Sequence, residues 1–188
     1  MSDIIKFDTV TQAFGVERVF KCSGYGLGAM VATMQNPKVI EIGCDIGDTT
    51  QFLLDSNPSL ELVGIDPYEN YVDWNGNNLN EREQVYNRFV ERLKGYVNRF
   101  SLYRKYSDDI HEMLQNETYD LIFIDGLHEY NQLSKDCVNY YPKLKEGGIF
   151  AGHDYNAIAG VRQAADEFAA KVGKKILITE CDVWYWIK

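Results

Sequence analysis

Residues 39–47 read Val-Ile-Glu-Ile-Gly-Cys-Asp-Ile-Gly and decide the fold of this 188-residue chain. A short apolar run from Val39 to Ile42 ends in a turn with two glycines, and an amphipathic stretch follows. Alternation of such runs and stretches is typical of βαβ units around a parallel sheet. Glycines at the carboxyl end of a strand let a ligand lie against the backbone. We therefore predict an α/β protein with a ligand site at Gly43 to Gly47.

The same alternation continues along the chain. Strands are predicted at residues 38–42, 60–65, 100–104, 119–124, 147–151, 175–179 and 183–187. Helices are predicted at residues 48–56, 81–95, 108–115, 131–141 and 161–172, with Pro142 ending the fourth. A nucleotide dehydrogenase would keep the parallel pattern to its end, whereas the last two strands here form a predicted β-hairpin. We expect a Rossmann-like fold with a mostly parallel seven-stranded sheet, a C-terminal hairpin and helices on both faces.

Length and composition favour a single domain, because 188 residues with 45% hydrophobic content suffice for one sizeable core. Residues 37–188 are predicted to form the Rossmann-like core, and residues 1–36 an N-terminal capping segment. Three glycines at positions 24, 26 and 28 indicate a flexible or capping stretch there. The net charge of −9 repels nucleic acids and anionic membrane surfaces. Neither is expected as a partner.

The four cysteines are widely separated and form no Cys-x-x-Cys pair. This usage fits a reducing compartment, and buried or incidental thiols are expected rather than nucleophiles. No apolar run approaches the length of a membrane span, and the N-terminus does not resemble a secretory signal. The sequence therefore predicts a soluble, cytoplasmic protein.

Carboxylates surround the glycine turn. Glu41, Asp45 and Asp48 would repel a pyrophosphate. A ligand with a sulfonium and an ammonium group, such as S-adenosylmethionine, matches such a turn. Asp66 follows about twenty residues later, at the end of the next strand, where a carboxylate can accept hydrogen bonds from both ribose hydroxyls. A turn-initiating Asp before Pro67 is the structural alternative.

Acid and imidazole groups end two further apolar strands. If these strands are neighbours, their ends lie about 5 Å apart, so that Asp125 and Asp154 can converge on one divalent cation. Oxygen ligands suit Mg²⁺, Mn²⁺ or Ca²⁺. His153 is a candidate further ligand or orienter, and His128 a candidate base for a substrate hydroxyl. A loop-capping histidine is the alternative for each, and His111, on a predicted helix, is assigned no function.

Two other segments carry weaker signals. Ser107 and Asp108 follow the third strand, at a corner that faces the adenine in this topology, although an N-cap explains Ser107 equally well. Residues 68–78 mix aromatic and amide side chains, which suit a sugar or another polar ring. Tyr68 and Trp74 are therefore candidate substrate contacts, with an ordinary surface loop as the alternative.

Four motifs together resemble class I S-adenosylmethionine-dependent methyltransferases, most closely the small family related to catechol O-methyltransferase. They are Val-Ile-Glu-Ile-Gly-Cys-Asp-Ile-Gly-Asp-Thr-Thr, Gly-Ile-Asp-Pro-Tyr, Ile-Asp-Gly-Leu-His-Glu-Tyr and Gly-Gly-Ile-Phe-Ala-Gly-His-Asp-Tyr, within residues 37–170. The resemblance implies metal binding by Asp125 and Asp154, to which we add His153. With the strand-end analysis, the expected cofactor-binding residues are Glu41, Gly43, Cys44, Asp45, Gly47, Thr49, Asp66, Pro67, Tyr68, Ser107, Asp108 and Asp125.

Two departures from the catechol type are visible. Tyr155 stands where those enzymes usually have Asn, and His128 stands where they have a catalytic Lys. The pattern is closer to metal-dependent sugar O-methyltransferases of macrolide biosynthesis, in which the corresponding His is the base, although these have Glu in place of His153. The resemblance implies methyl transfer to a hydroxyl of a small polar or sugar-like acceptor, with divalent-metal assistance.

Other readings of the sequence stay open. One is a metal-independent methyltransferase with His128 as its only base, and another is a module that binds the cofactor without catalysis. The sequence also leaves homo-oligomer formation open.

Overall fold

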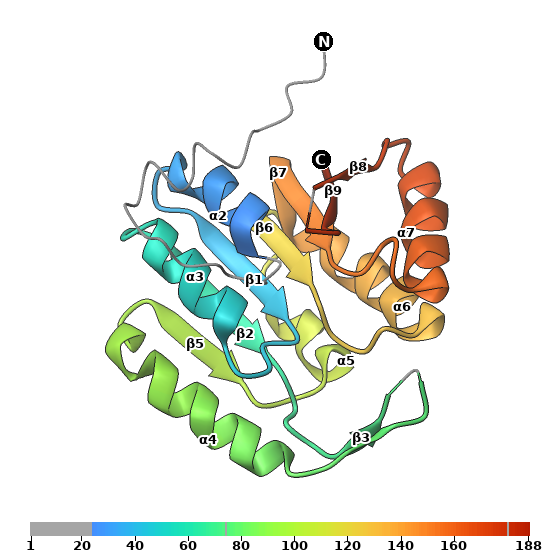
Figure 1. The fold of residues 1–188 in the computed structure, drawn as a ribbon. Coiled ribbons are helices and arrows are strands. Elements are labelled where there is room, and N and C mark those ends of the chain that lie inside the picture. The colour runs from blue at the N-terminus through green and yellow to red at the C-terminus, as the bar shows by residue number, and fades with distance from the viewer. Residues whose placement is uncertain (1–23, 74, 180) are drawn as a thin grey trace.

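The computed structural model of the chain describes residues 24–73, 75–179 and 181–188 (Figure 1). They contain a seven-stranded sheet in the order β5-β2-β1-β6-β7-β9-β8. Five neighbouring strands of this order, from β5 through β2, β1 and β6 to β7, are parallel. Strand β9 pairs antiparallel with β7 and β8. The predicted mostly parallel sheet with a C-terminal hairpin is confirmed. Its strands are β1 (Lys38–Ile42), β2 (Glu61–Ile65), β5 (Phe100–Tyr103), β6 (Tyr119–Ile124), β7 (Leu144–Gly152), β8 (Leu177–Ile178) and β9 (Trp184–Ile187).

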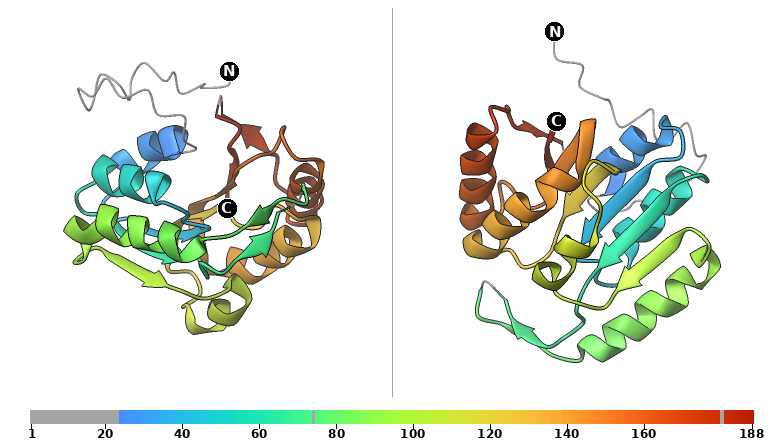
Figure 2. Two further views of the ribbon diagram at one scale, coloured as in Figure 1. Left: turned by 60° about the horizontal axis from the view of Figure 1, so that its bottom comes forward. Right: turned by 180° about the vertical axis from the view of Figure 1, so that it is seen from behind.

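Helices cover both faces of the sheet, as Figures 1 and 2 show. Along β1, Val39 belongs to one buried cluster and Ile40 to the other, because successive side chains of a strand point to opposite faces. Parallel crossovers bring the carboxyl ends of β1, β2, β5, β6 and β7 to one edge, where ligands bind in such sheets. One face carries α2 (Gly24–Ala32), α3 (Asp48–Ser56) and α4 (Arg82–Leu93), and the other α5 (Ser107–Ile110), α6 (Tyr130–Tyr140) and α7 (Ala159–Lys171).

Element bounds differ from the predicted ones in both strands and helices: β7 begins three residues earlier than predicted, and β8 has two residues instead of five. The predicted helix at residues 81–95 is divided into α4 and a 3-10 turn, η1 (Lys94–Tyr96). A second turn, η2 (His111–Met113), follows α5. Pro142 does not end α6 directly, because it lies in a third turn, η3 (Tyr141–Lys143), where its missing N–H leaves no helical bond unmade. Among the described residues, no helix is both long and apolar enough to cross a membrane.

The N-terminal glycine run is helical rather than flexible. Helix α2 packs on α3 so closely that a Cβ atom on Gly28 would lie 2.2 Å from a ring carbon of Phe52. The side-chain amide of Asn57 donates hydrogen bonds to the carbonyl oxygens of Val31 and Met34, at 2.8 and 2.9 Å. Of the two predicted alternatives, a flexible or a capping stretch, the helix at residues 24–32 fits the capping one, since Leu27 and Val31 pack in the same buried cluster as Val39 of the sheet. The rest of the predicted capping segment lies outside the described residues.

A two-stranded hairpin that the sequence did not predict follows β2. Strands β3 (Tyr71–Val72) and β4 (Asn78–Leu79) pair with each other and belong to a separate sheet. Asp73 holds their turn, because its carboxylate accepts hydrogen bonds from two backbone N–H groups and from the side-chain amide of Asn77. Two-residue strands have no alternating pattern long enough to be read from a sequence.

The carboxyl ends of β1 and β6 are in direct backbone contact. The N–H group of Asp125 donates to the carbonyl oxygen of Ile42 at 2.7 Å. A Cβ atom on Gly43 would lie 2.1 Å from the carbonyl oxygen of Asp125, and Gly43 has a φ of +85°. Only glycine meets both requirements, since it has no Cβ atom and tolerates positive φ.

Gly43→Ala is expected to destabilise the protein far more than Gly147→Ala. Gly147 also has a positive φ, of +77°, but nothing lies within 4 Å of its missing Cβ. We expect the control variant to lose about 1 kcal/mol of unfolding free energy from backbone strain alone, and Gly43→Ala to lose about 2–4 kcal/mol because the two strands must separate as well. Urea unfolding measures both. Equal losses would contradict the packing argument.

Candidate functional site

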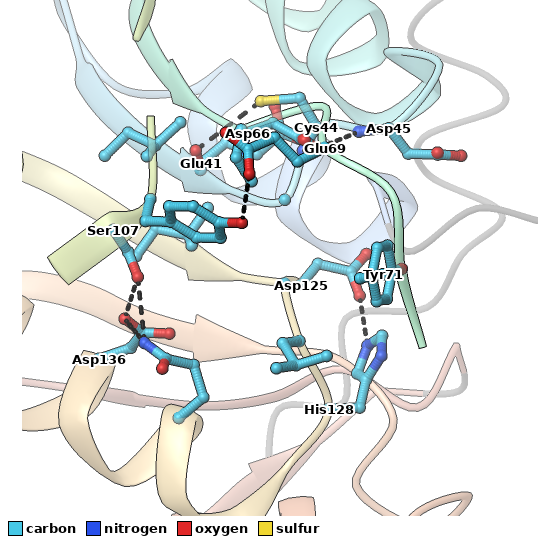
Figure 3. A pocket seen from close by; sticks show the side chains of 18 of the residues that line it. Glu41, Cys44, Asp45, Asp66, Glu69, Tyr71, Ser107, Asp125, His128 and Asp136 are labelled. Carbon is cyan, nitrogen blue, oxygen red and sulfur yellow. Dashed lines mark hydrogen bonds and ion pairs between the residues drawn. The ribbon is translucent and has the colours of Figure 1, made fainter. Parts of the chain in front are cut away.

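A cavity of about 750 Å³ lies at the carboxyl edge of the sheet (Figure 3). Its walls come from the loops after β1, β2, β5 and β6 and from the β3–β4 hairpin. Three of the predicted site residues, Gly47, Tyr68 and Asp154, are absent from its lining. The predicted residues that line it are Glu41, Gly43, Cys44, Asp45, Thr49, Pro67, Asp66, Ser107, Asp108, Asp125, His128 and His153.

The glycine loop is fastened to the end of β2 by Asp66. One oxygen of its carboxylate accepts hydrogen bonds from the backbone N–H groups of Cys44 and Asp45, both at 3.0 Å, and the other accepts one from Tyr68 at 2.9 Å. Burial raises the pKa of Asp66, and these bonds offset that effect only in part. Nη2 of Arg82 also lies 3.7 Å from Oδ2, too far for a hydrogen bond, so one of the about four acceptor positions of this carboxylate is not used by a hydrogen bond.

Tyr68 supports the glycine loop from the core, and its prediction as a substrate contact is wrong. Its side chain is buried, packs against Tyr86 and Phe89, and donates its hydroxyl to the carbonyl oxygen of Asp45 at 2.8 Å. Gly47 likewise faces Phe89, at the start of α3, with a φ of +83°. Trp74, the other predicted substrate contact, lies outside the described residues.

The expected field of free carboxylates around the turn is not present. Asp45 forms an ion pair with Arg82 at 2.6 Å, and Asp48 forms one with Arg92. Glu41 is buried, and desolvation raises its pKa to about 8, although Thr50 donates a hydrogen bond to it. The predicted repulsion of a phosphate ligand is therefore wrong in its physical basis, because arginines that are distant in sequence pair with Asp45 and Asp48, and burial favours the neutral form of Glu41.

Asp125, His128 and Asp154 form a cluster at the ends of β6 and β7. Their ligand atoms all lie within 4.8 Å of one another. Nε2 of His128 is 3.2 Å from Oδ1 of Asp125 and 3.0 Å from Oδ2 of Asp154. Asp154 has a φ of +58°, a conformation that turns it back toward the strand ends. One nitrogen and two carboxylate oxygens at this spacing are a donor set that fits a divalent cation.

His153 joins the same cluster. Its Nδ1 lies 3.5 Å from Oδ1 of Asp125 and 3.2 Å from Oδ1 of Asp154, while its Nε2 bonds the carbonyl oxygen of Cys181 at 3.0 Å. Burial lowers the pKa of both imidazoles, but the two aspartates outweigh it and raise the pKa of His128 to about 9 and that of His153 to about 10. The imidazoles in turn lower the pKa of Asp154.

A buried polar group that the sequence analysis missed lies at another corner of the cavity. Asp136 of α6 is 1% exposed and accepts a hydrogen bond from the hydroxyl of Ser107 at 2.6 Å. Its position was readable, because it shares the buried face of α6 with Leu133, Cys137 and Tyr140 at helical spacing. A charged residue on an apolar helix face indicates a partner or a function.

The hairpin and the start of α4 supply further lining that no motif announced. Tyr71, Val72 and Leu79 face the cavity from the hairpin. Arg82 lies between Asp45 and the rings of Tyr68 and Tyr71, at 5.7 and 5.8 Å from their centroids. Figure 3 shows Tyr71 in the same part of the cavity as Asp125 and His128.

Residues 40–155 match the profile of a family described as a methyltransferase domain. The chain belongs to this methyltransferase family. The match contains three of the predicted motifs in full and the first from Ile40 onward, and it confirms the predicted methyltransferase family.

Two curated relatives of this methyltransferase are uncharacterized proteins. One, from Sinorhizobium fredii, is 29% identical over 72 residues, which cover 38% of this chain and 8% of the relative. The other, from Acanthamoeba polyphaga mimivirus, is 26% identical over 118 residues, which cover 62% of this chain and 50% of the relative. The chain thus spans half or less of the length of these relatives.

Solved structures share the fold of this methyltransferase at low identity. The O-methyltransferase TomG of Streptomyces achromogenes, in complex with S-adenosylmethionine, is 11% identical with a TM-score of 0.60, covering 100% of this chain and 91% of that one. The methyltransferase PaMTH1 of Podospora anserina, bound to S-adenosylhomocysteine, is 15% identical with a TM-score of 0.61, covering 98% and 87%.

Glu41→Gln is expected to remove part of the pH dependence of stability. The pKa of Glu41 is raised from 4.5 to about 8, so the folded protein holds a proton that the unfolded chain releases above pH 4.5. This contribution is fully present below pH 4.5 and is lost as the pH rises through 8. As the pH rises through this window, the unfolding free energy of the unsubstituted protein should therefore fall relative to that of Glu41→Gln by about 1.4 kcal/mol per pH unit. Denaturant unfolding without ligand at several pH values measures the difference, and parallel curves would contradict it.

Proposed function

We propose that this methyltransferase transfers the methyl group of S-adenosylmethionine to a hydroxyl of a small polar or sugar-like acceptor, assisted by a divalent cation. One observation carries the proposal: the loop held by Asp66 and the cluster of Asp125, His128 and Asp154 line one edge of the same sheet, next to a single cavity. A cofactor on the loop would present its methyl group to an acceptor at the cluster.

The glycine loop supports cofactor binding in two ways. Gly43 exposes backbone to the cavity without a side chain, so a ligand can lie against it. Asp66 keeps an acceptor position for a ribose hydroxyl while three N–H groups fix its orientation. TomG and PaMTH1, which share the fold, hold S-adenosylmethionine and S-adenosylhomocysteine. S-adenosylmethionine supplies a methyl group on a sulfonium, an electrophile that needs only an oriented nucleophile.

Asp125, Asp154 and His153 are the residues that would hold the cation. The bond from Nε2 of His153 to the carbonyl oxygen of Cys181 leaves Nδ1 as the atom directed at both carboxylates, and metal-binding histidines are commonly oriented in this way. A bound Mg²⁺, Mn²⁺ or Ca²⁺ would supply Lewis acidity that lowers the pKa of an acceptor hydroxyl. Carboxylate and imidazole donors suit such ions.

A cation bound by the two carboxylates would offset the charges that raise the pKa of His128 to about 9, and a neutral His128 would then receive the acceptor proton at Nε2. That atom lies 3.0 Å from Oδ2 of Asp154, so the imidazolium that results would be stabilised by a carboxylate. The same position would also allow His128 to be the third ligand in place of His153. Loss of a ligand would weaken metal binding, whereas loss of the base would lower the rate of methyl transfer. Two alternatives keep the fold: metal-independent transfer with His128 as the only base, and cofactor binding without catalysis.

The cofactor assignment predicts a selective shift in melting temperature. A ligand that binds only the folded protein raises the melting temperature in proportion to the logarithm of its concentration. S-adenosylhomocysteine at about 100 times its Kd should add about 2.7 kcal/mol of stability, and NAD at equal concentration should add less. Differential scanning fluorimetry compares the two. Stabilisation by NAD and not by S-adenosylhomocysteine would overturn the proposed function.

The cluster predicts different defects for its two histidines. His153→Ala and Asp154→Asn should weaken Mn²⁺ binding at least about tenfold in titration calorimetry, because each removes a ligand or its donor atom. His128→Ala should retain Mn²⁺ affinity within about threefold and lose methyl transfer by about 10²–10⁴. His111→Ala, which changes the remaining histidine, is the control for both.

Weakened Mn²⁺ binding in His128→Ala and not in His153→Ala would make His128 the ligand. Full activity in chelator, together with unchanged S-adenosylhomocysteine binding, would favour the metal-independent alternative.

A further inference from the structure

A hydrogen-bond network with a defined direction lies at the corner of the cavity formed by α5 and α6. The hydroxyl of Ser107 is 2.6 Å from Oδ1 of Asp136, and Nε2 of Gln132 lies 3.3 Å from each of these two oxygens. The hydroxyl of Tyr140 donates to the carbonyl oxygen of Ser107 at 2.8 Å, and Gln132 also reaches Asp108 at 3.2 Å. Ser107, Gln132 and Asp136 all line the cavity, and Figure 3 shows Ser107 and Asp136 bonded there.

We infer that Asp136 is a specificity-determining residue of the cofactor site: it fixes Ser107 as a hydrogen-bond acceptor toward the cavity, so that the site selects a purine with a 6-amino group over one with a 6-oxo group. This inference rests on the proposed function, since it assumes an adenosyl cofactor. The role that it assigns to Asp136 is exerted through Ser107, so Asp136 acts by positioning a proton.

The corner is where the base of an adenosyl ligand would lie. Asp66, the ribose-binding candidate, ends β2, and the cluster at Asp125 ends β6. In the sheet, β2 lies between β5 and β1, with β6 beyond β1. A ligand whose methionine part reaches toward β6 from a ribose at β2 therefore directs its base away from that part, toward the loop after β5 that contains Ser107.

The donor and acceptor inventory of the network sets its direction. An ionised carboxylate can only accept hydrogen bonds, so Ser107 must donate its one hydroxyl proton to Asp136. The amide of Gln132 is a donor to Oγ of Ser107. With its proton committed, Oγ presents only lone pairs to the cavity. It can accept a hydrogen bond from a 6-amino group, whereas a 6-oxo group would place two acceptors face to face.

Protonation of Asp136 would release this constraint. Burial raises the pKa of Asp136 to about 6, while Ser107 and Gln132 lower it in part. The other charged groups that act on it are Asp108, which raises its pKa, and Lys135, which lowers it and pairs with Asp108 at 3.4 Å. A protonated carboxyl group can donate to Ser107, which then can turn its own proton toward the cavity. The preference for a 6-amino group should decline as the pH falls through about 6.

The experiment compares two ligands whose purines differ at position 6 and therefore also at N1, which is an acceptor in adenine and carries a proton in hypoxanthine, so the informative quantity is how their ratio changes with Asp136 and pH. Titration calorimetry measures the Kd of S-adenosylhomocysteine and of S-inosylhomocysteine, in which a carbonyl oxygen replaces the 6-amino group, at pH 7.5 and pH 5.5. The ratio of the two Kd values is the readout. Titrations elsewhere in the site, including those of the histidine cluster, affect both ligands equally and cancel in this ratio.

Two substitutions at one position separate polarity from charge. Asp136→Leu removes the acceptor and suits the apolar face of α6, so Ser107 becomes free to donate. Asp136→Asn keeps an acceptor oxygen, which the donors Ser107 and Gln132 hold in place, and removes the titration. Asp109→Asn is the matched control, because Asp109 is an exposed residue of α5 two positions after Ser107.

The unsubstituted protein and Asp109→Asn should prefer S-adenosylhomocysteine by about tenfold at pH 7.5, the worth of one hydrogen bond against one mismatch. This ratio should fall about fourfold at pH 5.5. Asp136→Asn should keep the ratio at both pH values, and Asp136→Leu should lose it at both. Should Asp136→Leu fail to fold, Ser107→Ala tests the same point, because without the hydroxyl the preference should vanish at both pH values.

The outcomes distinguish this inference from the proposed function. The role of Asp136 is overturned if Asp136→Leu or Ser107→Ala keeps the ratio of the unsubstituted protein. It is also overturned if the unsubstituted protein itself has a ratio near one. In both cases an adenosyl site stands. Absence of S-adenosylhomocysteine binding to the unsubstituted protein overturns both.

Discussion

The backbone contact between Gly43 and Asp125 is the constraint on which the rest of the site depends. It joins the end of β1 to the end of β6 with no room for a Cβ atom between them. The loop that Asp66 holds therefore lies directly beside the residue that begins the Asp125, His128 and Asp154 cluster. A methyl donor and its acceptor must be brought within a few ångströms of each other, and a rigid strand pair provides such alignment better than a mobile loop does.

The acidic side chains around the cavity are compensated in different ways. Glu41 is buried with a raised pKa, Asp45 pairs with an arginine, and Asp66 accepts hydrogen bonds from three backbone N–H groups. Uncompensated buried charge is costly, so compensation of this kind is required for folding. The acidic cluster at β6 and β7 is compensated by two imidazoles, whose positive charge a bound cation would supply instead.

What the sequence could predict was local or repetitive. The strands and helices of the sheet follow from alternating apolar runs, and the strand-end residues Asp66, Asp125 and Asp154 follow from the rule that parallel strands end at one edge. Arg82 and Asp136 were missed because their roles come from contacts with residues 37 and 29 positions away, and Tyr71 was missed because it lies in a hairpin of two-residue strands. Tyr68 was misassigned since burial beneath a loop leaves no signature in composition.

The pairing of β1 with β6 also shapes how the chain reaches this structure. The N–H group of Lys38 bonds the carboxylate of Asp120, a closure across 82 residues, whereas β1 and β2 are joined by one short helix. Loop-closure entropy must be overcome before such a distant pairing is rewarded, so contacts of this type form slowly. The glycine loop can take its final shape only when β6 has arrived. A ligand that touched both strand ends would therefore stabilise a pairing between distant parts of the chain, whose loop-closure cost is larger than that of a locally paired hairpin.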